Sequence, residues 1–350
     1  MSILGVNIRE LIPPEAIKEI ELESLKGRTI AIDAYNALYQ FLAAIRQPDG
    51  TPLIDNKGRV TSHLSGIFYR TINLIEAGIK PIYVFDGLPP SLKEKELEKR
   101  RKVKEEAAKK YQVAIAEEKY EEARKYAQIS TRLNDEMVKE AIKLLDAMGL
   151  PTVQAPAEGE AQAAYMAKKG DVWSSGSQDY DSILFGSPRV VRNLTVSGKR
   201  KLPKKDVYID IKPEVIESNV IYEKLGINRE KLIIIGIMLG TDYNPDGIKG
   251  VGIKTALKIV KSYEKTEEIL KSLPQTQVDY YEIFNYFMNP EVTDNYTIQW
   301  KEPSVEKIKE ILVEEHDFNE ARVENAIERL QKSFKENVKS QTKGLDFWFK

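Results

Sequence analysis

The 350-residue sequence contains no cysteine, and only two of its residues are histidine. The absence of cysteine excludes disulfides, thiolate metal sites and cysteine nucleophiles. Long hydrophobic runs are missing as well, because the longest, over residues 232–240, is far too short to span a bilayer. Residues 1–5 lead at once into charged, proline-containing sequence, which is not the pattern of a signal peptide. We therefore expect a soluble, intracellular protein.

Positive and negative charges are also nearly balanced. The chain has 53 Lys and Arg residues against 54 Asp and Glu residues, so its net charge is −1 although 31% of its residues are charged. Without a global basic field, the protein can contact nucleic acid only through local basic patches. At this length, an apolar fraction of 42% is typical of a globular protein with one large domain or two.

The order strand, acid, helix occurs twice in the first hundred residues. Residues 29–33 have the pattern of a buried strand that ends in Asp33, and an apolar-rich helix follows over residues 34–45. After helical spacing over residues 62–77, the strand at residues 80–86 again ends in an acid, Asp86. This alternation predicts an α/β fold with a largely parallel sheet, in which ligands bind at the carboxyl ends of the strands. Residues 11–28, before the first of these strands, look like a short helix and a turn.

Two pairs of acids lie at the ends of further short strands, which we predict at residues 151–153 and 172–175. One pair is Glu158 and Glu160, and the other is Asp179 and Asp181. Taken alone, either pair could equally consist of solvated loop acids, as most Asp and Glu residues are. A further acid, Asp242, follows an apolar helix at residues 230–240.

Together these acids predict a metal site. Seven carboxylates at buried strand ends repel one another unless cations lie between them. His63 and His316 stand alone in the sequence and look like ordinary side chains, so the expected ligands are oxygens only. Oxygen ligands select Mg²⁺ or Mn²⁺ over Zn²⁺. Two such ions beside basic residues indicate hydrolysis of a phosphodiester by a metal-activated water.

Local basic patches are present in three places. Residues 93–110 hold nine Lys or Arg residues against five Glu, in a charged helix from residue 91 to about 124 that buries little and therefore projects from the body. Residues 198–205 form a basic loop. The glycine-rich run at residues 247–252 suits a hairpin whose backbone N–H groups face a phosphate. Such a run is a weak signal alone, but Lys249, Lys254 and Lys258 favour the backbone of a nucleic acid over a mere tight turn.

Several of these segments resemble the flap endonucleases of the XPG superfamily, and the archaeal members most closely. The motifs occur in the family's order over nearly the whole chain: I-A-I-D-A, S-H-L-S-G-I-F-Y-R-T, V-F-D-G-L-P-P, A-P-A-E-G-E-A-Q-A-A-Y, Q-D-Y-D-S-I-L-F-G and L-G-T-D-Y-N with I-K-G-V-G-I-K-T-A. The resemblance implies a structure-specific 5′ flap endonuclease, with 5′ exonuclease and gap activity, that cuts DNA near the single-strand/double-strand junction. Its implied roles are Okazaki fragment maturation and DNA repair.

The resemblance also implies roles for individual residues. Two groups of acids match the ligands of two Mg²⁺ ions, for which Mn²⁺ can substitute: Asp86, Glu158 and Glu160 around one, and Asp179, Asp181 and Asp242 around the other. Asp33 is implied to act through water or from outside the direct ligands. Lys93 and Arg100 match the residues that polarise the scissile phosphate and stabilise the charge of the transition state. With Asp33 and Asp181, they form the expected catalytic set.

Other matches concern contacts with DNA. The charged segment matches a helical arch through which a single-stranded 5′ flap passes. Tyr39 matches an aromatic residue that stacks on a nucleobase, and Arg46 and Arg70 match arginines that contact duplex or phosphate. Three residues match a helix–two-turn–helix element that holds the duplex backbone, commonly with a K⁺ ion: Gly250, Gly252 and Lys254.

The two ends of the chain depart from the family's usual pattern. The last ten residues resemble the sliding-clamp (PCNA) motif, Gln-x-x-aliphatic-x-x-aromatic-aromatic. Leu345, Trp348 and Phe349 fit its aliphatic and aromatic positions, while Gln341 stands one residue away from the Gln position. At the other end, residues 5 and 6 match the family's usual start, which leaves residues 1–4 as an apparent extension.

We expect one nuclease domain over residues 1–340, with a mostly parallel twisted sheet and helices on both faces, and a flexible clamp-binding tail over residues 341–350. Within the domain, residues 1–90 and 131–240 supply the two halves of the site. Residues 91–130 form the arch, residues 241–262 the helix–two-turn–helix element and residues 263–340 a helical C-terminal part.

The implied setting is an archaeal cell, in its cytoplasm or on its nucleoid. There the protein is expected to work as a monomer on branched DNA, bound to the clamp and to no membrane. Two alternatives stay open. One is a nuclease of the same fold that prefers another junction, such as four-way or gapped DNA. The other is a non-catalytic DNA- or clamp-binding protein.

Overall fold

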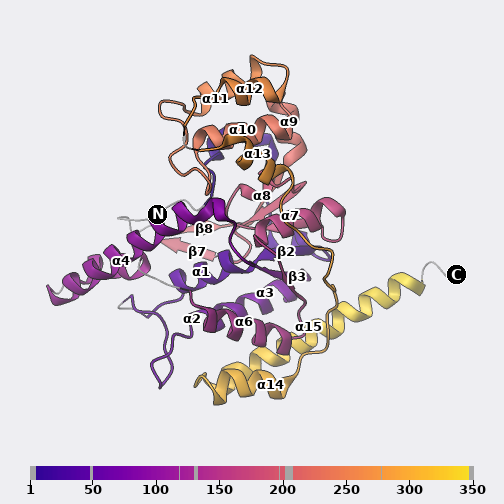
Figure 1. Ribbon diagram of the computed structural model, residues 1–350. Helices are drawn as coiled ribbons and strands as arrows, with labels where there is room; N and C mark the ends of the chain where they lie inside the picture. Colours follow the sequence, from indigo (N-terminus) through magenta and orange to yellow (C-terminus); the bar gives the residue numbers. More distant parts are fainter. Residues whose placement is uncertain are drawn as a thin grey trace.

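A seven-stranded sheet forms the centre of the computed structural model, which describes residues 5–47, 50–117, 119–129, 133–196, 198–201, 208–276 and 278–346 (Figure 1). Its strands lie in the order β1-β9-β6-β5-β2-β3-β4. The five strands from β6 to β4 are parallel, while β9 pairs antiparallel with both β6 and β1. The strands are β1 (Ile17–Glu19), β2 (Thr29–Asp33), β3 (Lys80–Phe85), β4 (Thr152–Gln154), β5 (Ser174–Gly176), β6 (Arg189–Arg192) and β9 (Glu214–Glu217). The predicted α/β class with a mostly parallel sheet is confirmed.

The strand at the edge of the sheet was not predicted. Residues 11–28 contain short 3₁₀ helices, but they also contain β1, which pairs with β9 through Ile17 and Ile216. A three-residue strand is too short to carry a hydrophobic alternation of its own, and its pairing with a distant segment decides its conformation. The expectation of a helix and a turn is therefore wrong at Ile17–Glu19.

Helices cover both faces of the sheet because side chains alternate along its strands. In β2, Ile30 and Ile32 belong to a core that includes residues of α1 (Ala34–Ala44), α3 (Thr71–Glu76) and α6 (Asp135–Ala147). Ala31 points the other way, into a core with residues of α7 (Gly159–Lys169). The remaining helices of the first core are α2 (Ser62–Ser65), the π-helical turn Gly66–Arg70, α14 (Val305–Lys309), the π-helical turn Glu310–Glu314 and α15 (Glu320–Asp346).

A third core lies under the helices that follow β5. It joins Ile216 of the sheet to a group of mainly short helices, which Figure 1 shows above the sheet. These helices are α8 (Asp181–Leu184), α9 (Ser218–Leu225), α10 (Arg229–Leu239), α11 (Ile253–Lys261), α12 (Thr266–Ser272) and α13 (Tyr280–Met288). In the part of the chain that the structure describes, no helix is both long and apolar enough to cross a membrane.

The charged segment after β3 forms a pair of helices that extends away from the body (Figure 1). A short 3₁₀ turn (Ser91–Lys93) leads into α4 (Glu94–Ala116), and α5 (Tyr120–Ile129) packs along it. Ala107 and Ala114 are buried, but Val103 and Val113 are about half exposed, at 48% and 55%. The sequence correctly predicts a projecting helix with little buried surface. The basic residues 198–205, which we expected to form a loop, begin with strand β7 (Gly198–Lys201). This strand pairs with β8 (Tyr208–Ile211).

Candidate active site

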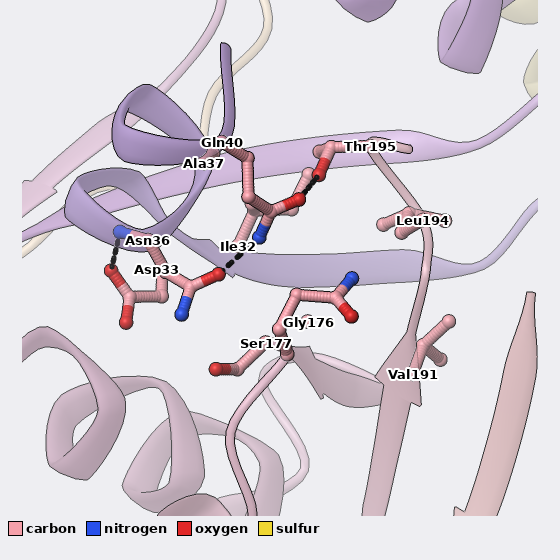
Figure 2. Close-up of a pocket in the computed structure, with 11 residues that line it drawn as sticks. Ile32, Asp33, Asn36, Ala37, Gln40, Gly176, Ser177, Val191, Leu194 and Thr195 are labelled. Atoms are coloured by element: carbon pink, nitrogen blue, oxygen red, sulfur yellow. Dashed lines mark hydrogen bonds between the residues drawn. The ribbon is translucent and has the colours of Figure 1, made fainter. Parts of the chain in front are cut away.

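Two acids leave the sheet where neighbouring parallel strands end. Asp33 is the last residue of β2 and the N-cap of α1, and its Oδ1 accepts a hydrogen bond of 2.9 Å from the backbone N–H of Asn36 (Figure 2). Asp86 follows β3, and its Oδ1 accepts a hydrogen bond of 2.7 Å from the backbone N–H of Gly159. Since β2 and β3 are hydrogen-bonded side by side, both acids lie at the same edge of the sheet.

The two acid pairs come from the next elements of the chain. Glu158 is the N-cap of α7, and Glu160 lies in the first turn of that helix. Asp179 follows β5, and Asp181 is the first residue of α8. Asp181 is only 5% exposed, and its Oδ1 accepts a hydrogen bond of 2.8 Å from the backbone N–H of Val6. The first described residues of the chain therefore reach the acid cluster.

The carboxylates lie close enough to raise one another's pKa. Burial, reinforced by the charge of Asp86, raises the pKa of Asp33 to about 8. Burial raises the pKa of Asp181 to about 7, with the charge of Asp242 as the next cause. Burial also raises the pKa of Glu160, and the charge of Asp179 adds to that shift. The structure thus brings the predicted acids into one group that has too little positive charge to keep all of them ionised.

Two basic side chains from the start of the projecting segment enter this group. The Lys93 ammonium lies 2.7 Å from Glu158 Oε1 and 3.0 Å from Asp242 Oδ2. The Arg100 guanidinium lies 2.7 Å from Asp242 Oδ1. Burial favours the neutral form of Asp242, but the charges of Lys93 and Arg100 outweigh burial and lower its pKa. Burial disfavours the charged form of Lys93 as well, yet Glu158 and Asp242 raise the pKa of Lys93, which therefore stays protonated.

The donor chemistry of this group fits a hard divalent cation. Every predicted ligand offers carboxylate oxygens, which Mg²⁺ and Mn²⁺ prefer. The raised pKa values of Asp86, Asp179 and Asp181 mark a local deficit of positive charge. Among the described residues, no set of three or more His, Asp or Glu side chains is placed so that it could hold a metal ion without rearrangement. Lys93 bridges Glu158 and Asp242, so a cationic group already lies between two of the predicted ligands.

One residue of the site, Tyr243, was missed from the sequence. Its hydroxyl donates a hydrogen bond of 2.6 Å to Glu158 Oε2, and the side chain is buried against Tyr286 and Phe287. The charge of Glu158 adds to burial in raising the pKa of Tyr243. Its position directly after Asp242 was the available signal, but a single tyrosine looks like an ordinary packing residue.

The residues expected to contact DNA lie in different environments. Tyr39 is half-buried on α1, and Lys104 of α4 lies 4.5 Å from the centre of its ring. The guanidinium of Arg46 donates hydrogen bonds to the carbonyls of Ala43, Gly50 and Ala127. Arg70 is half-buried and ends the π-helical turn after α2. None of these contacts assigns a DNA-binding role, which stays a prediction for all three residues.

The predicted glycine hairpin is exposed and precedes a helix. Gly250 has a φ of +82°, in the left-handed region that favours glycine, and Gly252 is the N-cap of α11. Lys254, in the first turn of α11, is exposed. Exposed backbone N–H groups at a helix N-terminus beside lysines suit a phosphate.

The residues expected to bind the clamp lie at the C-terminal end of the chain, in α15 and after it. Trp348 and Phe349 lie outside the described residues. For Gln341 and Leu345, the structure describes only the backbone, within α15.

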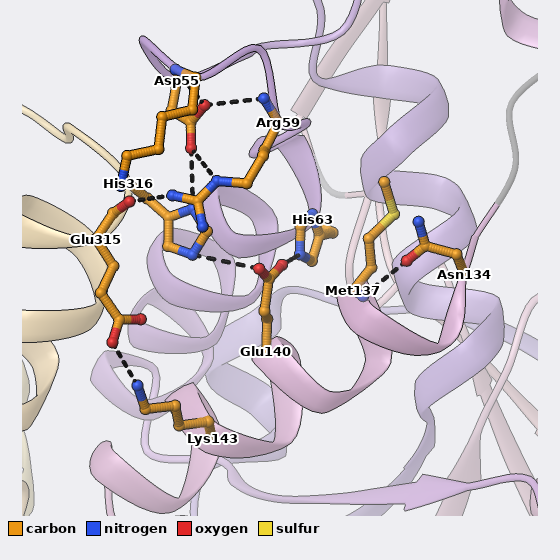
Figure 3. Close-up of polar contacts among 10 residues, drawn as sticks. Asp55, Arg59, His63, Asn134, Met137, Glu140, Lys143, Glu315 and His316 are labelled. Atoms are coloured by element: carbon orange, nitrogen blue, oxygen red, sulfur yellow. Dashed lines mark hydrogen bonds and ion pairs between the residues drawn. The ribbon is translucent and has the colours of Figure 1, made fainter.

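The two histidines lie in a second buried polar cluster, which contains none of the seven acids of the candidate site (Figure 3). Glu140 of α6 joins them, because its Oε2 lies 2.9 Å from His63 Nε2 and its Oε1 lies 3.4 Å from His316 Nε2. His316 Nδ1 in turn lies 3.4 Å from Asp55, which pairs with Arg59 at 2.7 Å. The cluster connects α2 and α6 to the segment after α1 and to the C-terminal helices.

Glu140→Ala should lower the free energy of unfolding by about 2–3 kcal/mol, because it leaves two buried imidazoles without their shared acceptor. Urea denaturation measures this change. Lys139→Ala, at an exposed neighbouring position of the same helix, is the control and should alter stability by no more than about 0.5 kcal/mol. Equal stability of the two variants would mean that the cluster contributes nothing to folding.

Comparison with known proteins points to a nuclease family. The family models described as XPG N-terminal domain and XPG I-region match residues 1–107 and 149–242. A protein of Staphylothermus marinus named flap endonuclease 1 is 60% identical over 349 residues, which cover 99% of this chain and 100% of the relative. The Pyrococcus furiosus protein of the same name is 58% identical over 347 residues, with 99% and 100% coverage. The solved structure of flap endonuclease-1 from Methanococcus jannaschii matches with a TM-score of 0.75 at 47% identity, over 95% of this chain and 99% of that one.

Proposed function

The chain belongs to the flap endonuclease family of the XPG nucleases, and from this we propose how its own residues cut branched DNA. It is a nuclease of DNA replication and repair, from a family that depends on metal ions. The substrate we propose is DNA with a single-stranded 5′ flap, cut near the single-strand/double-strand junction to leave a 5′-phosphate and a 3′-hydroxyl. The observation that supports this most is the pairing of Lys93 with Glu158 and Asp242, because it puts a cation from the projecting segment at the acid cluster.

We propose that the acid cluster holds two Mg²⁺ ions, with Mn²⁺ as a substitute. One ion would be held by Asp86, Glu158 and Glu160, and the other by Asp179, Asp181 and Asp242, with Asp33 acting from outside the direct ligands. When bound, such ions supply Lewis acidity at a phosphate and make water a better nucleophile. The buried, like-charged acids support this assignment, because the raised pKa values of Asp33 and Asp181 would fall once positive charge is added.

Lys93 and Arg100 would then bind the scissile phosphate. Their cationic groups pair with Glu158 and Asp242, and metal charge added to those carboxylates would leave both groups available for phosphate oxygens. A fixed cation that meets the phosphate in a partly buried site stabilises the extra negative charge of the transition state. Both residues lie at the start of the projecting helices, so the flap itself would pass beside α4.

Several wider assignments belong to the same proposal. The helices α4 and α5 would form the arch for the single-stranded flap, with Tyr39 stacking on a base near the site and Arg46 and Arg70 near the duplex. The hairpin before α11 would hold duplex backbone, together with a K⁺ ion. Exposed backbone and lysines at the hairpin support this, as described above.

The partners and the cellular setting are also proposals. We propose that the protein is a monomer by itself and that residues 341–350 bind the sliding clamp through Leu345, Trp348 and Phe349. It would act in the cytoplasm of an archaeal cell, at the nucleoid. The residue boundaries given above for the nuclease domain, the arch and the tail stand with this proposal.

The test compares labelled double-flap, gapped and four-way DNA as substrates, with Mg²⁺ and with a chelator. We expect cleavage at the flap junction in Mg²⁺, weaker cleavage of gapped DNA, and no cleavage with the chelator. Preferred cleavage of four-way DNA would favour a junction-resolving nuclease of the same fold. Binding of all three substrates without any cleavage would favour a non-catalytic DNA-binding protein instead.

A further inference from the structure

Three polar side chains form a hydrogen-bonded chain that ends on Asp179. The hydroxyl of Thr195 donates to Gln40 Oε1 at 2.9 Å, and Gln40 Nε2 donates to Asn36 Oδ1. Asn36 Nδ2 then donates to Asp179 Oδ2 at 2.7 Å. Figure 2 shows the first two of these bonds along the wall of a small pocket that Asn36, Gln40, Ser177 and Thr195 help to line.

All three bonds run in one direction. A carboxylate that binds a cation is ionised and can only accept hydrogen bonds, so the amide nitrogen of Asn36 must face Asp179. That orientation turns the Asn36 oxygen toward Gln40, and the Gln40 oxygen toward Thr195. Successive donors that point the same way polarise one another and strengthen the last bond, here the one to the acid.

The chain is held rigidly at both ends. Asn36 lies in the first turn of α1, where its backbone N–H is bonded to Asp33, so one residue contacts acids that follow the neighbouring strands β2 and β5. Thr195 is 6% exposed and lies between β6 and β7. Gln40, one turn after Asn36 on α1, fills the space between them. A carboxylate tied to a rigid helix has less freedom to turn away from a bound ion.

We propose that Asn36 is a positioning residue of the nuclease, which orients Asp179 toward its cation with Gln40 and Thr195 as support. This inference rests on the proposed function, because it takes Asp179 to be a metal ligand. Asn36 contacts neither the ion nor the DNA in this scheme. Its effect should therefore appear in the affinity for metal and not in the affinity for DNA.

The experiment measures Mn²⁺ binding to the full-length, DNA-free protein by isothermal titration calorimetry. Asn36→Leu keeps the number and branching of the side-chain heavy atoms and removes the side-chain hydrogen bonds, and it should raise the Kd for Mn²⁺ by about 10- to 100-fold. Thr195→Val removes only the far end of the chain and should raise that Kd in the same direction by a smaller factor. Asn285→Leu, at an exposed position on α13, is the matched control and should leave the Kd unchanged.

Kinetics provide the second readout. For Asn36→Leu, the Mg²⁺ concentration that gives half-maximal cleavage of double-flap DNA should rise by the same factor as the Kd. At saturating Mg²⁺, both kcat and the KM for DNA should return to near the wild-type values. If Asn36 merely filled space in the fold, the variant would lose thermal stability while its Mn²⁺ affinity stayed at the wild-type value.

A folded Asn36→Leu variant with wild-type Mn²⁺ affinity would overturn the inference. Should that variant not fold, Thr195→Val and Gln40→Leu carry the test, and wild-type Mn²⁺ affinity in both would overturn it equally. Failure of the wild type to cut flap DNA would count against the proposed function instead. The two failures are distinguishable because Mn²⁺ binding is measured without substrate.

Discussion

Asp181→Ala should bind double-flap DNA as well as the wild type does but cut it about a thousandfold more slowly. Asp181 is buried, and Asp242 lies close enough for its charge to raise the pKa of Asp181. The substitution would therefore remove one of the carboxylates proposed to hold the second ion. A thousandfold loss corresponds to about 4 kcal/mol, the scale expected when metal stabilisation of the transition state is lost. Removing a negative charge does not weaken the attraction of DNA, so the expected Kd is equal or lower.

The measurement pairs single-turnover cleavage in Mg²⁺ with DNA binding in Ca²⁺. Asp146→Ala, at an exposed position on α6, is the control and should cut at the wild-type rate. If Asp181→Ala cut as fast as this control, the assignment of Asp181 as a ligand would be wrong. If both variants lost DNA binding, the defect would lie in folding and not in the chemistry.

Lys93→Ala should lower kcat by about 100- to 1000-fold with little change in the KM for flap DNA, the pattern for an interaction that strengthens in the transition state. The neighbouring carboxylates raise the pKa of Lys93, and a bound phosphate would favour its charged form in the same way. The pH dependence of cleavage below pH 9 should therefore not reflect this residue. Lys139→Ala, at an exposed position on α6, is the control and should have near wild-type kinetics.

Mn²⁺ binding separates a catalytic role of Lys93 from a structural one. In the DNA-free protein Lys93 neutralises Glu158 and Asp242, and its removal leaves both carboxylates in need of another cation. Lys93→Ala should therefore bind Mn²⁺ at least as tightly as the wild type. Loss of Mn²⁺ binding together with loss of cleavage would show that Lys93 organises the acids rather than acting on the phosphate.

The sequence predicted the strands whose own residues form an apolar run, but not a strand that depends on its pairing partner. The run from Thr29 to Asp33 has no polar interruption before its final acid, and β2 has these bounds. The predicted strand at residues 172–175 begins two residues before β5 and ends one residue before it, although the backbone N–H of Trp173 still bonds to the Thr29 carbonyl of β2. Strand β1 could not be predicted, since only its pairing with β9 makes it a strand.

The site also divides into residues that the nearby sequence predicts and residues whose partners lie far away in sequence. Most of the seven acids lie at strand ends or at the start of a helix, while Asp242 follows α10. Strand-end logic and family motifs pointed to all of them, and their role as metal ligands stays a prediction. Tyr243 and Asn36 were missed although each lies close to a predicted acid in sequence, because their partners Glu158 and Asp179 lie 85 and 143 residues away. Arg46 illustrates a further difficulty: a motif can suggest contact with DNA, while the structure shows donors already bonded to the chain's own carbonyls.

The reach of these contacts has a consequence for the newly made protein. Val6 and Asp181, bonded to each other, are 175 residues apart in sequence, and Arg100 and Asp242 are 142 apart. Because the ribosome makes the chain from its N-terminus, the amino-terminal segment must wait for Asp181, and the base of α4 must wait for Asp242. A growing chain therefore cannot complete these contacts of the site until about two thirds of it has been made.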